Sequence, residues 1–274
     1  MEFIENNYNN IIQMKKKISM LLLISILLSI LLFNLLNEDV NSNKDNFEIN
    51  DEIDLFVISL RHEDRMKNIE IQQKKIGKTI QIFDAVKGDH LNEEKLIQEN
   101  ILSKNAILQT NEKRRKREIG CYLSHLNLLK QIQNNSEDGY TIIFEDDIHI
   151  KTDNFLKDVK QIIENVKGNF DLIYLGNINN NNGKQFIDNI YYVDVNGSIL
   201  GTHGYLINNN SINKLIPLIN FIEMPIDIVY EKLSKENKIN TFIIFPTLVN
   251  QGGAKSSTIN DLSIENFTTY TCYK

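Results

Sequence analysis

The sequence has 274 residues, of which 42% are hydrophobic and 24% are charged, and its formal net charge is −6. This composition fits one sizeable globular domain with an additional segment at one end, and it excludes a disordered chain. The negative charge argues against a nucleic-acid-binding protein, which needs a basic surface. The two cysteines, Cys121 and Cys272, are too few for a disulfide scaffold and lack the spacing of a zinc motif.

An apolar segment near the N-terminus has the length of a membrane anchor. It runs from Ile18 to Leu36, 19 residues without a charge, directly after Lys15-Lys16-Lys17. At about 1.5 Å per residue a helix of this length spans roughly 28 Å, close to the hydrocarbon thickness of a bilayer. The lysines before it predict a cytosolic N-terminus and a single-pass type II protein whose remainder faces the lumen or the exterior. A cleaved signal peptide is the alternative, although no small-x-small cleavage pattern follows.

The sequence therefore divides into five predicted segments. These are a cytosolic tail (1–17), a transmembrane anchor (18–36), a polar linker (37–51), a folded domain (52–260) and a C-terminal tail (261–274). No internal repeat is visible, and neither a phosphate-binding P-loop nor a dinucleotide fingerprint occurs.

The folded domain opens with a predicted buried strand over residues 53–60, followed by a helix that ends near Ile76 with Gly77 as its cap. A strand that leads into a basic and polar turn can form an anion site. Arg61 and Arg65 are four residues apart, so within a helical turn they would share one face. The alternative is that both arginines make ordinary surface pairs with neighbouring acids.

A second strand is predicted over residues 79–86, and Asn92 should cap a short helix that reaches about residue 98. The basic run 113–117 then begins a long apolar helix that carries Cys121 and His125. The run is either a solvated helix start or a contact for phosphates. Cys121 is expected to be a small buried hydrophobe, and a lone histidine on an apolar helix is more often a core residue than a ligand.

Three consecutive carboxylates, Glu145-Asp146-Asp147, follow the apolar run Thr141–Phe144. The run is typical of a buried strand, and unpaired acids cannot be buried inside a strand without a large cost in free energy. They are therefore predicted at its C-terminal end, where open α/β sheets bind their ligands. Hard oxygen ligands of this kind suit Mg²⁺ or Mn²⁺ carrying a phosphate. A solvated acidic turn is the simpler alternative.

The remaining chain predicts further alternation of helices and strands. Helices are expected over residues 154–166, over 210–219 with Asn210 or Ser211 as cap, and from Pro225 onward. Strands are expected over residues 171–176, 190–195, 201–207 and 241–245. Residues 177–183 are predicted to form an Asn-rich loop. Asp227 lies in the first turn of the helix that begins at Pro225, where complementing the helix dipole is its simplest role.

Seven separate motifs, taken in this order, resemble those of glycosyltransferase family 25, the group of bacterial lipooligosaccharide and collagen galactosyltransferases. The resemblance covers approximately residues 53–257. The motifs are Val57–Leu60 with Arg61 and Arg65, Phe83–Val86 with Gly88, Glu118–His125, Phe144–Asp147, Gly204–Ile207, Pro225–Asp227 and Pro246–Gln251. Lys87 departs from the family, which usually has an aspartate there, and the chain has no room for the second transferase domain of the collagen enzymes.

The resemblance implies a GT-A-like fold, a single α/β domain with a central mixed, mostly parallel sheet flanked by helices. It also implies a nucleotide-sugar donor and Mn²⁺, or Mg²⁺ in its place, held by Asp147 with help from Asp146 or Glu145. Asp227 is the candidate general base, and Asp146 is its competitor. Further implied donor contacts are Arg61, Arg65, His125 and Glu145, while Gly204 and Tyr205 would shape the sugar or acceptor side of the pocket.

The expected protein is thus a membrane-anchored, metal-dependent and inverting transferase that moves galactose or glucose from a UDP-sugar to a glycan or glycosylated protein. Its topology indicates an enzyme of the endoplasmic reticulum or Golgi that faces the lumen, or one encoded by a large virus. Two other classes compete with this interpretation. One is a catalytically inactive relative that acts as a glycan-binding or chaperone subunit, and the other is a metal-dependent phosphoryl-transfer enzyme or nuclease.

Overall fold

The computed structural model describes residues 53–135, 138–178 and 182–252. The predicted cytosolic tail, the anchor at 18–36, the linker and the C-terminal tail at 261–274 lie outside the described residues. Among the residues that are described, no helix is both long enough and apolar enough to cross a bilayer.

The first half of the domain alternates strands and helices. It consists of β1 (Ile53–Ser59), α2 (Glu63–Ile76), β2 (Gln81–Asp84), the 3-10 turn η1 (Gly88–His90), α3 (Glu93–Gln98), α4 (Glu112–Asn135), β3 (Tyr140–Glu145) and β4 (Ile148–Ile150). Two predicted caps are confirmed. Gly77 ends α2 in the left-handed conformation, and the Asn92 side chain accepts a hydrogen bond from the Lys95 backbone N–H at the start of α3.

The second half completes the sheet. It consists of α5 (Phe155–Asn165), β5 (Leu172–Tyr174), β6 (Asn182–Ile187), β7 (Ile190–Val193), β8 (Gly204–Asn208), η2 (Asn209–Ser211), α6 (Ile212–Ile219), α7 (Ile226–Lys235), β9 (Thr241–Ile244) and β10 (Val249–Gln251). Ser211 is the N-cap residue of α6, as predicted, but its side chain makes no capping hydrogen bond. The Asn208 side chain instead accepts from the Asn210 N–H, because the chain enters α6 through the 3-10 turn.

Eight strands form the central sheet in the order β2-β1-β3-β8-β5-β9-β7-β6, and β4 pairs with β10 in a separate two-stranded sheet. The expectation of a mixed sheet flanked by helices is confirmed, but "mostly parallel" is wrong. Only three of the seven neighbouring pairs in this sheet are parallel, namely β1 with β2, β1 with β3 and β5 with β9. The sequence shows which segments are strands, but strand direction depends on long-range pairing.

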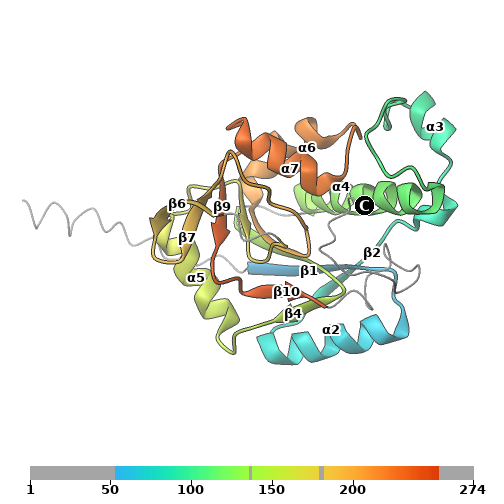
Figure 1. Ribbon diagram of the computed structural model, residues 1–274. Coiled ribbons are helices and arrows are strands. Elements are labelled where there is room, and N and C mark those ends of the chain that lie inside the picture. Colours follow the sequence, from blue (N-terminus) through green and yellow to red (C-terminus); the bar gives the residue numbers. More distant parts are fainter. Residues whose placement is uncertain (1–52, 136–137, 179–181, 253–274) are drawn as a thin grey trace, which may run out of the picture. The chain divides into compact units, whose positions relative to one another are not determined.

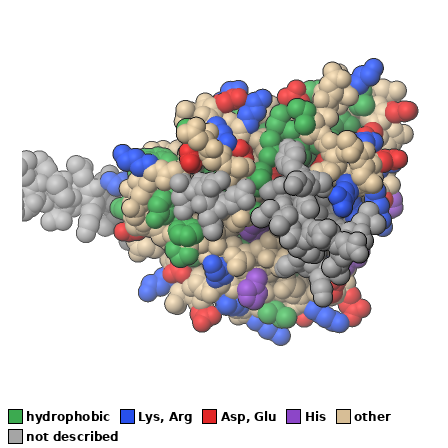
Figure 2. Space-filling model, in the orientation of Figure 1, with side chains coloured by type: hydrophobic (Ala, Val, Ile, Leu, Met, Phe, Trp, Pro, Cys, Tyr) green, Lys and Arg blue, Asp and Glu red, His purple; other side chains and the backbone are tan. Residues whose placement is uncertain are grey.

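Helices cover both faces of this sheet, so each face buries its own apolar core (Figure 1). The first core joins α2 and α5 to one face through residues such as Ile69, Val159 and Phe144. The second core joins α4, α6 and α7 to the other face through residues such as Leu126 and Ile143. Because successive residues of a strand point to opposite faces, Ile143 and Phe144 of β3 belong to different cores. Figure 2 shows basic and acidic side chains interspersed on the visible surface.

Two glycines bring α4 close to the segment between β2 and η1. A Cβ atom at Gly120 would lie 2.7 Å from the Val86 carbonyl oxygen, and one at Gly88 would lie 2.3 Å from the Lys116 carbonyl oxygen. The Val86 N–H also donates to the Ser124 hydroxyl over 2.8 Å, and this hydroxyl donates to the Gly120 carbonyl. This contact positions α4 against the ends of β1 and β2.

We therefore expect Gly120→Ala to lower the free energy of unfolding by roughly 1–3 kcal/mol, because the new methyl group meets backbone atoms that cannot move aside. Urea unfolding monitored by circular dichroism measures this loss. Gly77→Ala is the contrasting variant, since its Cβ meets nothing within 4 Å and only the positive φ of 73° opposes it. A Gly120→Ala protein more stable than wild type, as helix propensity alone would give, would contradict the close approach.

Candidate active site

A cavity of about 350 Å³ opens beside the carboxyl end of β3. Its walls come from the end of β1, the segment 85–89 after β2, the inner face of α4 and the end of β3. Its lining side chains include Arg117, Cys121, His125, Glu145 and Asp146. The cavity therefore lies where the carboxyl ends of parallel strands β2, β1 and β3 meet, as predicted for the ligand site.

The acidic triplet divides between the two faces of the sheet, and Arg65 holds two of its members. Arg65 is 5% exposed, and its Nη1 lies 3.4 Å from Asp146 Oδ1 and 3.3 Å from Asp147 Oδ2. Asp146 Oδ2 also accepts a 2.7 Å hydrogen bond from the Ser59 hydroxyl at the end of β1. Burial raises the pKa of Asp146, and the Ser59 hydroxyl and Arg65 oppose this shift.

Asp147 keeps one carboxylate oxygen without a partner. Its Oδ2 accepts from Gln251 Nε2 over 3.2 Å, whereas its Oδ1 is buried and has no hydrogen-bond partner. Burial and then the nearby Glu145 charge raise the pKa of Asp147 to about 7. Asp147 does not line the cavity. It lies next to β10, and its backbone carbonyl accepts a hydrogen bond from the Gly252 N–H.

Two polar residues of α2 fix the turn that carries these acids. Asn68 Nδ2 donates to the carbonyl oxygens of Asp146 and Ile148, each over 3.0 Å. Gln72 accepts from the Ile150 N–H over 3.0 Å and donates to Asn68 Oδ1. Sequence analysis missed both residues, because a polar residue on an amphipathic helix looks like part of its solvated face.

Glu145 points to the opposite face of the sheet, toward α4. His125 Nε2 lies 3.7 Å from Glu145 Oε1, and the Thr202 hydroxyl donates to the same oxygen over 2.7 Å. Burial alone would raise the pKa of Glu145, but the His125 imidazole and the Thr202 hydroxyl outweigh it and lower that pKa. Tyr205 is fully buried, and its hydroxyl lies 3.0 Å from His125 Nδ1. Tyr205 therefore orients the histidine and does not line the cavity.

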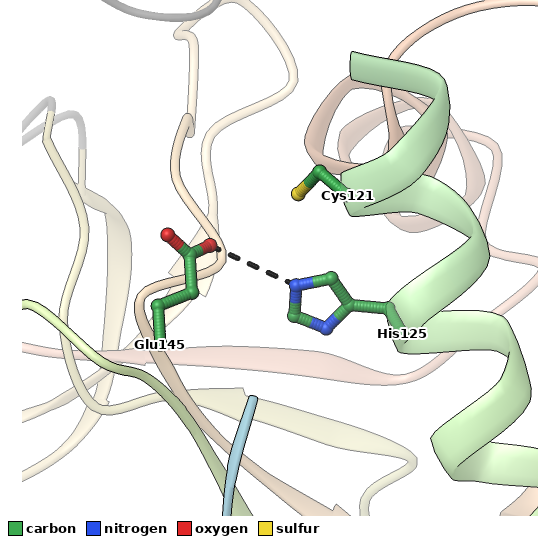
Figure 3. Close-up of side chains that lie close together, drawn as sticks. All are labelled: Cys121, His125 and Glu145. Atoms are coloured by element: carbon green, nitrogen blue, oxygen red, sulfur yellow. Dashed lines mark ion pairs between the residues drawn. The ribbon is translucent and has the colours of Figure 1, made fainter. Parts of the chain in front are cut away.

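Cys121 joins His125 and Glu145 in one group (Figure 3). The three ligand atoms all lie within 4.8 Å of one another, and this is the one cluster of three metal-ligating side chains found among the described residues. The expectation that Cys121 is a buried small hydrophobe is wrong in part, because the residue is partly exposed and lines the cavity.

Asp227 is 2% exposed at the start of α7 and lies outside the cavity wall. Its Oδ2 accepts from the Gly201 N–H over 3.2 Å, and its Oδ1 accepts from the Ile228 N–H over 2.9 Å. Burial raises the pKa of Asp227 to about 6. The carboxylate thus does more than complement a helix dipole, since it also anchors the loop that leads into β8.

Three other sequence predictions have mixed outcomes. Arg61 and Arg65 do not share a helical face, because Arg61 precedes α2 with a positive φ of 59° and pairs with Asp84. Gly204 is packed against Val249, so its missing side chain makes room for β10. In the basic run, Arg115 forms an ion pair with Glu93, while Arg117 lines the cavity.

Glu118 is a buried acid to which sequence analysis gave no role. It is 3% exposed; its Oε2 accepts from the Gln109 N–H over 2.9 Å, and its Oε1 has no partner. Burial, reinforced by the charge of Asp227, raises the pKa of Glu118 to about 7. Its position seven residues before His125 on the inner face of α4 could have indicated this burial.

The fold and site together define an α/β protein whose ligand cavity adjoins an acidic end of its sheet. The chain belongs to glycosyltransferase family 25, the lipopolysaccharide biosynthesis proteins, and the family match covers residues 52–230. Family membership supports a glycosyltransferase activity with a nucleotide-sugar donor and a glycan acceptor.

A comparison with curated proteins finds no match. Among solved structures, A197 from STIV is similar at 11% identity, with a TM-score of 0.34, over 72% of this chain and 83% of that chain. A likeness this low carries no functional argument.

We expect Glu118→Gln to remove part of the pH dependence of stability. The unfolded chain ionises Glu118 near its ordinary pKa of 4.5 and the folded protein at about 7, so the folded state loses stability as pH rises between these values. Between about pH 5 and pH 8, the free energy of unfolding should fall by on the order of 2 kcal/mol less in the variant than in the wild type. Urea titrations at several pH values measure this.

The exposed acid Glu164 of α5 provides the control, since Glu164→Gln should follow the wild-type curve. If the Glu118→Gln and wild-type curves stay parallel over the whole range, Glu118 does not carry a raised pKa.

Proposed function

We propose that this protein transfers a hexose, galactose or glucose, from a UDP-sugar to a glycan or glycosylated protein. The observation that carries this proposal is the 350 Å³ cavity beside the acidic end of β3, in a member of glycosyltransferase family 25. Its polar walls and its position at the strand ends suit a nucleotide with a charged diphosphate. Lys87 and Arg117 border it and offer positive charge for the phosphates.

The proposed divalent ion is Mn²⁺ or Mg²⁺, with Asp147 as its main ligand and Asp146 beside it. The partnerless Asp147 Oδ1 supports this assignment, because a buried carboxylate oxygen without a hydrogen bond is costly unless a cation binds it. Asp147 does not itself line the cavity, so Asp146, which does, would bring the ion to a diphosphate bound there, where it would neutralise the charge that develops as the diphosphate leaves. Arg65 contacts both carboxylates, but Ser59 also occupies the second oxygen of Asp146, so Asp147, whose Oδ1 has no partner, has the greater free capacity.

Asp227 is the proposed general base, with Asp146 as the second candidate; of the two carboxylates, Asp146 is the one that lines the cavity. With a pKa of about 6, the Asp227 carboxylate is mostly ionised at neutral pH and can still accept a proton. In an inverting displacement this proton comes from the acceptor hydroxyl, whose oxygen attacks the anomeric carbon while the nucleoside diphosphate leaves. No glycosyl-enzyme intermediate is then required.

The proposed location of the protein follows from its N-terminal apolar segment. The apolar segment 18–36 supports a type II anchor that would place the catalytic domain in the lumen of the endoplasmic reticulum or Golgi.

A catalytically inactive binding subunit is the competing function. The retention of buried acids at one sheet edge opposes it, because clustered carboxylates raise the energy of the folded protein unless they are used.

Asp147→Asn should lower sugar transfer at least roughly 100-fold and remove its dependence on Mn²⁺, because the amide cannot supply a charged metal ligand. Release of UDP from UDP-galactose or UDP-glucose, measured with an acceptor-glycan mixture, follows the activity. Asp158→Asn is the matched control, since Asp158 lies on α5, does not line the cavity, and accepts a hydrogen bond from the Thr152 hydroxyl. Full activity of Asp147→Asn would overturn the metal assignment.

Asp227→Asn should reduce kcat roughly 100-fold or more while leaving donor affinity nearly unchanged, because it removes proton acceptance. In the wild type, kcat/KM should rise with pH through about 6, since the base must lose its proton before it can act. A pH-rate profile that keeps this rise in Asp227→Asn would assign the base to another residue, with Asp146 the first to test.

A further inference from the structure

We propose that Cys121, His125 and Glu145 form a binding site for a Zn²⁺-class ion, separate from the oxygen-ligated ion proposed at Asp147. This inference goes beyond the proposed transferase function and does not depend on it.

The backbone places the three ligands around one point. Cys121 and His125 are four residues apart on α4, so they lie on the same helical face one turn apart. Glu145 ends β3 and faces them from the sheet (Figure 3). Their ligand atoms lie within 4.8 Å of one another, and His125 Nε2 lies 3.7 Å from Glu145 Oε1. Small side-chain shifts bring such atoms to metal-ligand distances of about 2.0–2.3 Å.

The nitrogen that faces Glu145 has no hydrogen-bond partner. His125 is fully buried, and its Nε2 is one of the partnerless buried atoms. Its other ring nitrogen lies 3.0 Å from the Tyr205 hydroxyl, which can accept the Nδ1 proton. In that tautomer the Nε2 lone pair faces a carboxylate oxygen 3.7 Å away, and a metal ion bound between the two atoms would take the place of the proton that otherwise links them.

His125 and Glu145 each have a hydrogen-bonding partner of the kind that usually supports a metal ligand. Tyr205 fixes the His125 ring from behind, and the Thr202 hydroxyl donates to Glu145 Oε1 over 2.7 Å. Supporting hydrogen bonds of this kind set the tautomer of a ligating histidine and the orientation of a ligating carboxylate. They also keep the ligand atoms near their binding positions before an ion arrives.

The ligand types select the ion. A thiolate with an imidazole and a carboxylate suits Zn²⁺, whereas Mg²⁺ and Mn²⁺ prefer oxygen ligands. Three protein ligands leave a fourth tetrahedral position open, and all three residues line the cavity, so this position can take water or an oxygen of a bound molecule. Binding exchanges the Cys121 S–H proton for the metal, so one proton is released and no oxidation occurs.

Cobalt titration of the reduced full-length protein tests the site, with Co²⁺ as a coloured substitute for Zn²⁺. We expect a thiolate-to-cobalt charge-transfer band in the near ultraviolet and intense visible bands of four-coordinate cobalt, both removed by one equivalent of Zn²⁺. Cys121→Ser should abolish the charge-transfer band. His125→Asn and Glu145→Gln should each weaken Co²⁺ binding at least 10-fold.

Cys272→Ser is the matched control, because it removes the other cysteine of the chain and should leave the band unchanged. Asp147→Asn should also leave it unchanged, which separates this site from the proposed oxygen-ligated ion. Circular dichroism confirms that each variant folds.

The proposal is overturned if wild type shows no charge-transfer band, if Cys121→Ser retains it, or if Cys272→Ser loses it. Failure of nucleotide-sugar binding with an intact cobalt band would overturn the proposed function alone.

Discussion

The buried guanidinium of Arg65 holds the acidic end of β3 together. Without it, Asp146 and Asp147 would be two adjacent, largely buried carboxylates beside a third, Glu145. Removing one partner of a buried ion pair typically costs about 3–5 kcal/mol, because the remaining charge is left uncompensated. One guanidinium nitrogen faces both carboxylates, and Asp147 Oδ1 still has no hydrogen-bond partner. This shortage of positive charge is the physical reason to expect a cation here.

The end of β3 at Glu145 and the turn that follows it then give Glu145 and Asp147 different surroundings. Glu145 lies on the α4 side with His125 and Cys121, where a histidine and a thiol favour a softer metal. Asp147 lies on the α2 side with Arg65 and Gln251, where the ligands are oxygens. Two carboxylates only two residues apart therefore belong to different environments, and the pKa values of Glu145 and Asp147 shift in opposite directions.

The sequence predicted the parts of this site that depend on local pattern. The apolar run before Glu145 identified the strand and its acidic end, and the family motifs pointed to His125, which lines the cavity, but also to Tyr205 and Asp227, which do not. It could not predict the partners that long-range packing supplies. Asn68 and Ser59 contact Asp146 across 78 and 87 residues of sequence, and no local periodicity encodes such contacts.

The fold shows the same division. Strands with strong apolar runs, such as β1 and β3, were predicted closely, whereas β4, β6 and β10 were missed. β4 and β10 have three residues each and depend on pairing with one another, and β6 lies partly in an Asn-rich stretch that lacks a strand pattern. Strand direction was also mispredicted, because a βαβ pattern suggests parallel pairing even where β8 returns antiparallel between β3 and β5.

The central claim is that the cavity beside β3 binds a nucleotide sugar. Calorimetric titration of the full-length protein in mild detergent with UDP-galactose and UDP-glucose, with and without Mn²⁺, tests it most directly. We expect saturable binding of at least one donor with one site per chain, and much weaker binding once Mn²⁺ is removed. Absence of binding by either donor and by UDP alone, in a protein whose circular dichroism shows an intact fold, would contradict it.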